Sequence, residues 1–357
     1  MSSQVSKVTR LPAALLKKSC VGVFSAVGVP AADAVMIAET LVLTDMRGVH
    51  SHGVIRSARY IDCINSGGIK PAAELEILND SPCAVRTSAA GGLGIPAASK
   101  AVELAMARAK AHGVAVVTVN HSDHYGAAGI YAMRCADSGL VGMSMSNTCP
   151  LVAPAGGAKA TIGNNPFSYA APGGKYRAIL FDICMSVVAS GKLIIAAAEG
   201  KKIPKDWILD ADGNPTDDPN EIWHDAIMLP FAAHKGYGFA VMVELLSAVL
   251  SGSGITEDVK SWNTVPGRDA DTGHCFIVLD PAFFGGLGEF RKRTDLLIDR
   301  LVATPPVAGV DRVRYPGEIE FEFEREADAE NNGVPLPESS VDELRRAAKM
   351  TGVKLDF

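Results

Sequence analysis

The sequence predicts a mixed α/β protein, and three observations support this. Residues 11–63 place apolar side chains at helical spacing, residues from about 83 onward alternate between apolar β-type runs and amphipathic helices, and the tail returns to a helical pattern. Such alternation is typical of helices packed on a sheet. We therefore expect a helical part made of residues 1–78, packing with 301–357, and a central sheet domain at 79–300.

The N-terminal part is expected to form two helices. The segment LPAALLKKSCVGVFSAV is amphipathic, Gly28-Val29-Pro30 interrupts it, and helical spacing resumes in AADAVMIAETLVLTDMRGVHSHG. The segment RGVHSHGVIR at 47–56 then falls at the end of the second helix or in the turn after it. Gly67, Gly68 and Pro71, with the acidic residues that follow them, indicate a linker.

The central part begins with a β-α-β unit. CAVRTSA is a predicted strand, PAASKAVELAMARAKAHG a helix with Pro96 near its first turn, and VAVVTVN a buried strand. A helix is expected near GAAGIYAMRCADSG, followed by strands near LVGMSMSN, AILFDIC and CFIVLDP. The helix predicted at 236–252 is apolar nearly all round, so we expect it to be buried. In the tail, Ser340 and Glu343 have the spacing of a capping box at a helix start.

The charge distribution argues against nucleic-acid and membrane partners, and the cysteine content bears on the cellular compartment. The 34 basic and 40 acidic residues are mixed along the chain, and no basic tract favours nucleic acid or an anionic membrane. No stretch reaches the roughly 18 apolar residues of a spanning helix, and Lys17 and Lys18 interrupt the N-terminal apolar run that a signal peptide would need. Seven widely spaced cysteines fit reduced thiols. We expect a cytoplasmic protein.

Gly92-Leu-Gly94-Ile-Pro-Ala97 matches the local form of a Rossmann phosphate loop, G-x-G-x-x-A. The next strand should then end in an acidic residue that holds the ribose hydroxyls, but it ends in Asn120 and His121. Pro96 also removes one N–H group from the helix terminus that would face a pyrophosphate. A glycine turn into a packed helix is therefore the favoured interpretation.

Four of the eight histidines lie in two tight groups, His50 with His52 and His121 with His124. Together with Asp123 they could supply a zinc or iron site, and the alternative function is then a metal-dependent hydrolase. His-x-His converges on one ion best from a strand, because alternate residues of a strand share a face. The helical pattern before His50 would instead point the first two imidazoles apart.

On a helix, His52 and Arg56 are four residues apart and would share one face. This places a proton carrier beside a guanidinium, the pair that a 2-hydroxy or 2-oxo acid requires, and Ser51 could orient the imidazole. The plainer alternative is a set of polar residues that caps a helix end. A binding protein that holds a small molecule without turnover is a third hypothesis, and the residues alone leave these open.

Many short motifs follow one another in a familiar order. Asp45-Met-Arg47-Gly48, Ser51-His52-Gly53 and Arg56 resemble the signature of the malate/L-lactate dehydrogenase family of the non-Rossmann type, which includes ureidoglycolate, sulfolactate and diketogulonate enzymes and imine reductases. The other segments similar to family motifs are Asn120-His-Ser-Asp-His124-Tyr-Gly126-Ala-Ala-Gly129, Pro154-Ala-Gly156-Gly157, Gly163-Asn-Asn165-Pro166, Phe181-Asp182-Ile-Cys-Met-Ser186, Gly191-Lys192, Ile203-Pro204, Asp206-Trp207, Gly213 to Pro219, His234-Lys235-Gly236-Tyr237-Gly238 and Tyr315-Pro316-Gly317-Glu318.

The resemblance implies hydride transfer between C4 of a nicotinamide and the carbinol carbon of a small 2-hydroxy acid, without a metal. It also implies a homodimer, and a cofactor crevice in a mixed sheet that is not a Rossmann fold. We expect NAD, because the overall charge is weakly acidic, with NADP as the alternative.

By the same resemblance, His52 would be the acid/base, with Ser51 beside it and Asp182 completing a relay, while Arg56 would hold the substrate carboxylate. His124 competes with His52 for the acid/base role. The residues that would line the cofactor are His124, Tyr125, Gly126, Ala127, Ala128, Thr148, Asp182, Ile183, Cys184, His234, Lys235, Gly236, Arg314, Pro316 and Gly317.

The chain departs from the family pattern at four places. His50 stands where an aspartate or another polar residue is usual, and Asn164 replaces a threonine that helps to hold substrate, which leaves the substrate open. Cys184 and Met185 replace an alanine-threonine pair, so the nicotinamide pocket is expected to be more apolar. Phe231-Ala-Ala replaces a glycine-rich lead into His234.

Overall fold

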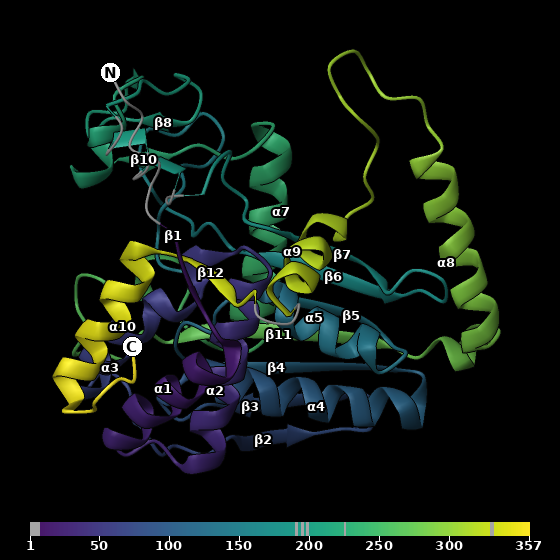
Figure 1. Cartoon of the computed structure of the whole chain (residues 1–357), viewed down its shortest axis with the longest axis horizontal. Coiled ribbons are helices and arrows are strands. Elements are labelled where there is room, and N and C mark those ends of the chain that lie inside the picture. Colours follow the sequence, from purple (N-terminus) through teal and green to yellow (C-terminus); the bar gives the residue numbers. More distant parts are fainter. Residues whose placement is uncertain (1–7, 190–191, 194–195, 198–199, 225, 329–331) are drawn as a thin grey trace.

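The computed structural model describes residues 8–189, 192–193, 196–197, 200–224, 226–328 and 332–357. Within these residues, a seven-stranded mixed sheet forms the centre of the molecule (Figure 1). The mixed α/β fold class predicted from the sequence is therefore confirmed. In spatial order the strands are β2 (Glu76–Asp80), β3 (Ala84–Ser88), β4 (Val114–Ser122), β11 (Thr272–Leu279), β5 (Val141–Ser146), β6 (Phe167–Pro172) and β7 (Ala178–Ile183).

Strand direction decides which loops meet at one edge of this sheet. Only β3 and β4 pair in parallel, and each of the other neighbouring pairs in the sheet is antiparallel. Because β11 lies between β4 and β5, and β6 between β5 and β7, the strands β4, β5 and β7 all run in the same direction. Their carboxyl ends therefore lie along the same edge of the sheet.

Helices cover both faces of the sheet. On β11, Phe276 and Val278 belong to the core beneath α4 (Gly94–His112) and α5 (Ala128–Asp137), whereas Cys275 belongs to the core beneath α7 (His234–Glu244). Alternate residues of a strand point to opposite faces, so α4 and α5 lie opposite α7. A short π-helical turn, Leu245–Val249, continues α7, and a small sheet of β8 (Ile208–Leu209), β9 (Pro215–Thr216) and β10 (Ile227–Met228) forms a separate projection.

The two ends of the described chain share one hydrophobic core. Residues of α1 (Ala13–Ala26), α2 (Ala31–Met46) and α3 (Ser57–Asn65) pack there with β12 (Val334–Pro337) and α10 (Glu338–Thr351). β1 (Val8–Leu11) pairs antiparallel with β12. The domain boundaries expected at 78/79 and 300/301 remain a prediction.

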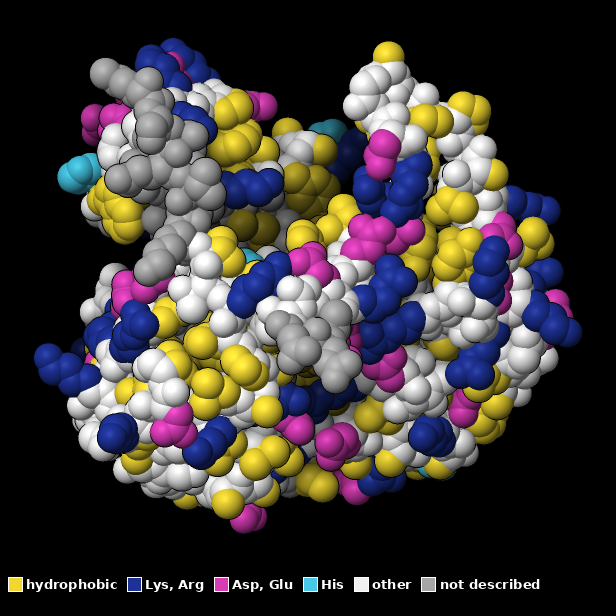
Figure 2. All heavy atoms as spheres, viewed as in Figure 1, with side chains coloured by type: hydrophobic (Ala, Val, Ile, Leu, Met, Phe, Trp, Pro, Cys, Tyr) yellow, Lys and Arg dark blue, Asp and Glu magenta, His cyan; other side chains and the backbone are white. Residues whose placement is uncertain are grey.

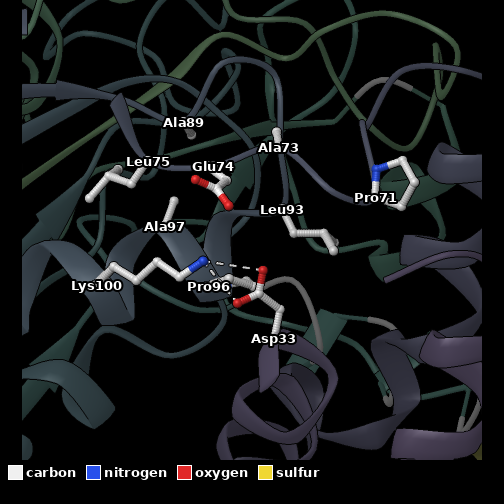
Figure 3. Close-up of a pocket in the computed structure, with 10 residues that line it drawn as sticks. All are labelled: Asp33, Pro71, Ala73, Glu74, Leu75, Ala89, Leu93, Pro96, Ala97 and Lys100. Atoms are coloured by element: carbon white, nitrogen blue, oxygen red, sulfur yellow. Dashed lines mark hydrogen bonds and ion pairs between the residues drawn. The ribbon is translucent and has the colours of Figure 1, made fainter. Parts of the chain in front are cut away.

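An ion pair joins this helical part to the sheet. Lys100 of α4 lies 2.9 Å from a carboxylate oxygen of Asp33 in the first turn of α2 (Figure 3). The pair borders a cavity of about 10 Å³, which is too small for a cofactor. The ion pair therefore joins α4 to α2, and the cavity beside it is not a binding site.

Two helices were not anticipated from the sequence. α8 (Leu287–Val302) forms an arm at the side of the molecule and packs against β6 and β7 through the buried Ile298, and a long connection leads from it to α9 (Glu318–Asp328) (Figure 1). Figure 2 shows a recess between this arm and the projection of β8 to β10, with acidic and basic side chains interspersed over the same face. Among the described residues, no helix is long and apolar enough to cross a membrane.

The linker expected after Pro71 is in part the edge strand β2, so that interpretation was wrong. All five residues from Glu76 to Asp80 are exposed, and an edge strand with two solvated faces shows no apolar alternation for a sequence pattern to detect.

The capping box expected at Ser340 is also wrong. Helix α10 begins at Glu338 directly after Pro337, so Ser340 lies inside the first turn, where its buried hydroxyl has no hydrogen-bond partner in the described structure. Pro337 ends β12 and is preorganised for a helix start, which places the terminus earlier than the capping pattern predicts.

The helix predicted at 236–252 is not buried all round. One face, with Ala240 and Val243, packs on the sheet, but Phe239, Val249 and Leu250 are about half exposed, at 47%, 51% and 54%. A helix lying on a sheet buries one side only, and no other part of the described chain covers the outer side.

Candidate active site

The segment RGVHSHGVIR forms two 3-10 turns after α2, His50–His52 and Val54–Arg56, joined by Gly53. The buried carboxylate of Asp45 holds this segment, because it accepts a hydrogen bond from Val54 N at 2.7 Å and contacts His50 Nδ1 at 3.0 Å. A Cβ at Gly53 would lie 2.2 Å from the same carboxylate. The expectation that His52 and Arg56 share one helix face is therefore wrong, since Asp45 draws the chain out of the helix between them.

Arg56 nevertheless lies beside His52 in space. Its Nε donates to Ser51 O at 2.6 Å, and its guanidinium carbon is 5.7 Å from the centre of the Trp262 ring. Among the described residues this half-buried guanidinium makes no ion pair, and burial lowers the pKa of Arg56. A desolvated cation without a carboxylate partner is a site for an anion.

Three aromatic rings are stacked next to this cation. The His52 and His124 rings are 5.4 Å apart at an interplanar angle of 21°, and Trp262 lies on the other side of His124 at 4.3 Å and 12°. Tyr60 of α3 borders both His124 and Trp262, with ring centres 5.8 and 5.1 Å away. The two candidate histidines therefore belong to one site.

His124 is placed by the loop after β4. Its backbone N–H donates to Asp123 Oδ1 at 2.6 Å, and a Cβ on Gly94 would lie 2.1 Å from the carbonyl oxygen of Asp123. The glycine that mimics a phosphate loop in the sequence is thus needed where the start of α4 meets the histidine loop. This agrees with the favoured interpretation of a glycine turn into a packed helix.

Both stacked histidines are held neutral at physiological pH. Burial, followed by the positive charge of Arg56, lowers the pKa of His52 to about 3, and burial with the neighbouring His52 and Arg56 lowers that of His124 well below its usual value. Burial raises the pKa of Asp123 to about 7. The two stacked imidazoles are therefore neutral, and Arg56 is the cation beside them.

The other two clustered histidines point elsewhere. His50 pairs with Asp45, and His121 is exposed, 3.3 Å from Asp271 and 3.5 Å from Asp269. Within the described part of the chain, no three histidine, cysteine or acidic side chains are grouped as metal ligands. The hydrolase alternative is therefore without support.

Asp182 lies at the end of β7 and is exposed to solvent. Its Oδ2 accepts a hydrogen bond from Gly129 N in the first turn of α5 at 2.7 Å, and a Cβ at Gly129 would collide with it. No hydrogen bond between Asp182 and His52 is present in the described structure. The proposed relay between them stays a prediction.

The segments expected to line the cofactor come from the shared edge of the sheet. Tyr125 to Ala128 follow β4, Thr148 follows β5, and Ile183 and Cys184 end or follow β7. Pro316 O accepts from Leu180 N at 3.0 Å, which ties the stretch before α9 to β7. Gly191 of the expected Gly191-Lys192 motif lies outside the described residues.

Asn164 is joined to two of these segments. Its Oδ1 accepts from Thr148 Oγ1 at 3.3 Å, and its carbonyl oxygen accepts from Met185 N at 2.7 Å. Met185 O in turn accepts from Phe231 N at 3.0 Å, three residues before the exposed His234 and Lys235 at the start of α7. Contacts therefore connect the segments after β5 and β7 with the start of α7.

The lead into His234 adopts a conformation that normally needs glycine. Ala232 and Ala233 have φ values of 46° and 52°, and Ala233 has ψ of −114°. Lys235 N donates to Ala232 O at 3.2 Å, so Ala233 occupies the second position of a type II′ turn. Because alanines stand here in place of a glycine-rich segment, two alanines have positive φ values, which alanine rarely adopts.

Tyr60 and Trp262 are site residues that sequence reasoning missed. Tyr60 follows Arg56 by four residues and carried a weak signal, because that spacing joins residues on one side of a helix. Trp262 lies in an irregular segment between the 3-10 turn Thr256–Asp258 and β11, far from both histidines in sequence, and carried none.

The sequence profile of the malate/L-lactate dehydrogenase family matches residues 11–345. Malate dehydrogenase from Pyrococcus horikoshii is 35% identical over 352 residues, covering 97% of this chain and 96% of that one. L-sulfolactate dehydrogenase from Methanocaldococcus jannaschii is 34% identical over 340 residues, covering 95% and 96%. The solved structure of the Pyrococcus horikoshii malate dehydrogenase superposes with a TM-score of 0.89 at 32% identity, covering 99% of each chain.

Proposed function

Because this chain belongs to the malate/L-lactate dehydrogenase family, we propose that Arg56, His52 and His124 form the substrate site of an NAD(P)-dependent 2-hydroxy acid dehydrogenase. The reaction interconverts a small 2-hydroxy acid and its 2-oxo acid. The nicotinamide, when bound, supplies or accepts the hydride at the carbinol carbon. The protein must hold the substrate carboxylate and exchange one proton with the neighbouring oxygen.

The unpaired guanidinium of Arg56 is the single observation that carries this proposal. A substrate carboxylate would accept hydrogen bonds from the guanidinium, in place of the protein carboxylate that is missing there. The 2-oxygen of a 2-hydroxy acid is one carbon away from the carboxylate, so it would come close to the imidazoles beside Arg56. The side chain of Trp262 would cover the guanidinium and exclude water.

His52 is the better proton carrier of the two histidines. Its Nδ1 lies 2.8 Å from Ser51 Oγ, and a hydroxyl can donate to a neutral imidazole or accept from a protonated one. Burial, and then the charge of Arg56, lower the pKa of His52, and an anionic substrate on Arg56 would offset the second of these two causes. Substrate binding would thereby move His52 toward the pH range of catalysis.

The residues at the shared sheet edge fit a nicotinamide dinucleotide. Backbone groups of Tyr125 to Ala128 and the exposed Lys235 could bind its phosphates without a Rossmann helix start, and Arg314 offers a second exposed cation. The remaining positions proposed to hold the cofactor are His124, Thr148, Asp182, Ile183, Cys184, His234, Gly236, Pro316 and Gly317. Relatives of this chain include NAD+-dependent and NADP+-dependent dehydrogenases, and we expect NAD here, with NADP as the alternative.

Asn164 is proposed to contribute to substrate choice. Its Oδ1 is engaged by Thr148, which leaves the amide N–H groups as donors for a ligand. Donors at this position favour a substrate with a second acceptor group besides its carboxylate. Malate and sulfolactate, the substrates named for two relatives, both have one.

The exposed apolar side of α7 and of residues 245–250, which continue it, supports a homodimer. Phe239, Leu245, Val249 and Leu250 form this surface, and an apolar stripe of this kind on a helix is typical of a subunit contact. Light scattering on the purified chain tests it, with Val249→Lys expected to lower the mass to that of a monomer. The cytoplasmic location, which all seven free thiols would tolerate, stays a prediction.

The experiment that tests the function follows NADH and NADPH absorbance in chelator-treated protein with oxaloacetate, pyruvate, 2-oxoglutarate, diketogulonate, sulfopyruvate and a cyclic imine. Arg56→Lys keeps the charge but loses the guanidinium geometry, so KM should rise strongly. His52→Gln should lower kcat by roughly 100-fold or more. Turnover that both variants retain in full, or that returns only with added metal, would contradict the proposal.

A further inference from the structure

Two protein groups contact Nδ1 of the His124 ring. The Tyr60 hydroxyl lies 2.6 Å from Nδ1, and Gly126 N donates to the same nitrogen at 3.3 Å. A backbone N–H group can only donate, so this contact favours an Nδ1 without hydrogen. At 3.3 Å it is weaker than the 2.6 Å contact with Tyr60 and does not fix the tautomer alone. A neutral ring without hydrogen on Nδ1 bears it on Nε2.

In that tautomer the Tyr60 hydroxyl acts as a donor to His124. It is also 3.2 Å from the carbonyl oxygen of His124, which can only accept. With an acceptor on each side, the hydroxyl hydrogen points at one of them, and the shorter distance favours Nδ1. Tyr60 is fully buried, and burial raises its pKa well above the usual value, so it stays protonated as a donor.

Burial first, and then the neighbouring His52, Arg56 and His274, oppose protonation of His124. His52 and Arg56 face it from the 3-10 turns, Tyr60 from α3 and His274 from β11, while Asp123, with its pKa raised to about 7, lies next in sequence. Trp262 stacks on the remaining face and excludes water. An imidazolium here would also have to break the hydrogen bond from Gly126.

We propose that Tyr60 is a positioning residue that fixes His124 as the neutral tautomer with hydrogen on Nε2, so that His124 donates a hydrogen bond to the substrate oxygen and carries no proton. This inference rests on the proposed function for the identity of that oxygen. In the reduction of a 2-oxo acid, the carbonyl carbon takes the hydride, the oxygen takes the proton of protonated His52, and the C=O double bond becomes a single bond. His124 begins and ends that step neutral, stabilising the charge that develops on the oxygen.

The tautomer can be read without turnover. In protein labelled with 15N-histidine, the His124 signals are identified by their loss in His124→Gln. We expect Nδ1 of the wild type to show the shift of an unprotonated ring nitrogen and Nε2 that of a protonated one from pH 6 to 8. In Tyr60→Phe the signals should move toward a mixture of the two tautomers. A protonated Nδ1 in the wild type, or an unchanged spectrum in Tyr60→Phe, would overturn the proposal.

Kinetics supply the second readout, with Tyr131→Phe as the matched control. Tyr131 is fully buried as well, but its hydroxyl donates to Tyr125 O and contacts neither of the stacked histidines. Tyr60→Phe should lower kcat by roughly tenfold with little change in KM, and Tyr131→Phe should not. Equal losses in both variants would assign Tyr60 a structural role only.

The pH profile separates the two histidines. His124→Gln keeps an N–H donor and should retain the ionisation that governs kcat, whereas His52→Gln should abolish it. The reverse result would make His124 the proton carrier and overturn the inference while the dehydrogenase function stands. If no substrate turns over, the proposed function fails, and the 15N spectra still decide the tautomer.

Discussion

The carboxylate of Asp45 lies directly against Gly53, so a Cβ added at residue 53 would be 2.2 Å from the carboxylate atoms. The same carboxylate accepts the backbone hydrogen bond of Val54 and contacts His50. The end of α2 therefore determines the path of the turns that place His52 and Arg56. A buried residue outside the reaction thus sets the geometry of the residues proposed for it.

Gly53→Ala should displace this turn. The added methyl group meets a buried carboxylate, so the free energy of unfolding should fall by about 1–3 kcal/mol, and activity should fall with it. Urea unfolding and steady-state rates measure both effects. Gly288→Ala in the first turn of α8 is the control, because nothing lies within 4 Å of its Cβ position and stability should hold or rise slightly. Equal behaviour of the two variants would contradict the clash.

Asp123→Asn should alter the pH dependence of stability. The carboxyl of Asp123 is 3% exposed and has its pKa raised by burial to about 7, so the folded protein binds its proton more tightly than the unfolded chain does. The contribution of this carboxyl group to the free energy of unfolding therefore decreases as pH rises from about 4 to about 7. Asparagine keeps the acceptor for His124 N and has no charge.

Asp123→Asn should consequently gain stability over the wild type at pH 8 and lose that advantage at pH 5. Urea unfolding at the two pH values measures the difference. An advantage that is the same at both pH values would show that the carboxyl of Asp123 does not titrate in this range.

Ala233→Gly should stabilise the protein. Ala233 occupies a turn position with φ of 52° and ψ of −114°, where a side chain costs about 1 kcal/mol or more and glycine does not. Thermal or urea unfolding should show a gain of about 1 kcal/mol. Ala240→Gly, in the regular part of the same helix, should instead lose about 1 kcal/mol. A loss in both variants would mean that Ala233 carries no strain.

Glu244 should be critical for the stability of the loops around the sheet edge. Its carboxylate is 5% exposed and accepts from Asn165 Nδ2 and Thr256 N, each at 2.8 Å, and from Asn147 Nδ2 at 3.3 Å. Glu244→Ala removes the buried acceptor that joins these three donors. Asn165 Nδ2 and Asn147 Nδ2 keep their bonds to Ala240 O and Gly254 O, so the free energy of unfolding should fall by about 1–3 kcal/mol. Glu244→Gln retains one acceptor oxygen and should lose less. Equal losses would indicate that packing, and not hydrogen bonding, is what Glu244 provides.

Elements with a strong apolar period were predictable from the sequence. The helices α1, α2, α4 and α5 and the strands β3, β4, β5, β7 and β11 all lie where spacing indicated them, because each buries a face that its own residues define. The edge strand β2 was missed, and the helix α7 was predicted but its half-exposed outer side was not, since exposure depends on which neighbours are present. Periodicity reports what a segment can bury and not what covers it.

Some features of the candidate site were likewise predictable from the sequence, and others depend on the tertiary structure. The sequence by itself determined the residue types, the family and the pairing of His52 with Arg56, because these reside in short contiguous motifs. Only the tertiary structure decided that His52 stacks on His124, that Trp262 and Tyr60 enclose them, and that Asp45 bends the turn. These contacts join segments far apart in the chain, and their energies arise only when the sheet and the helical part are packed together.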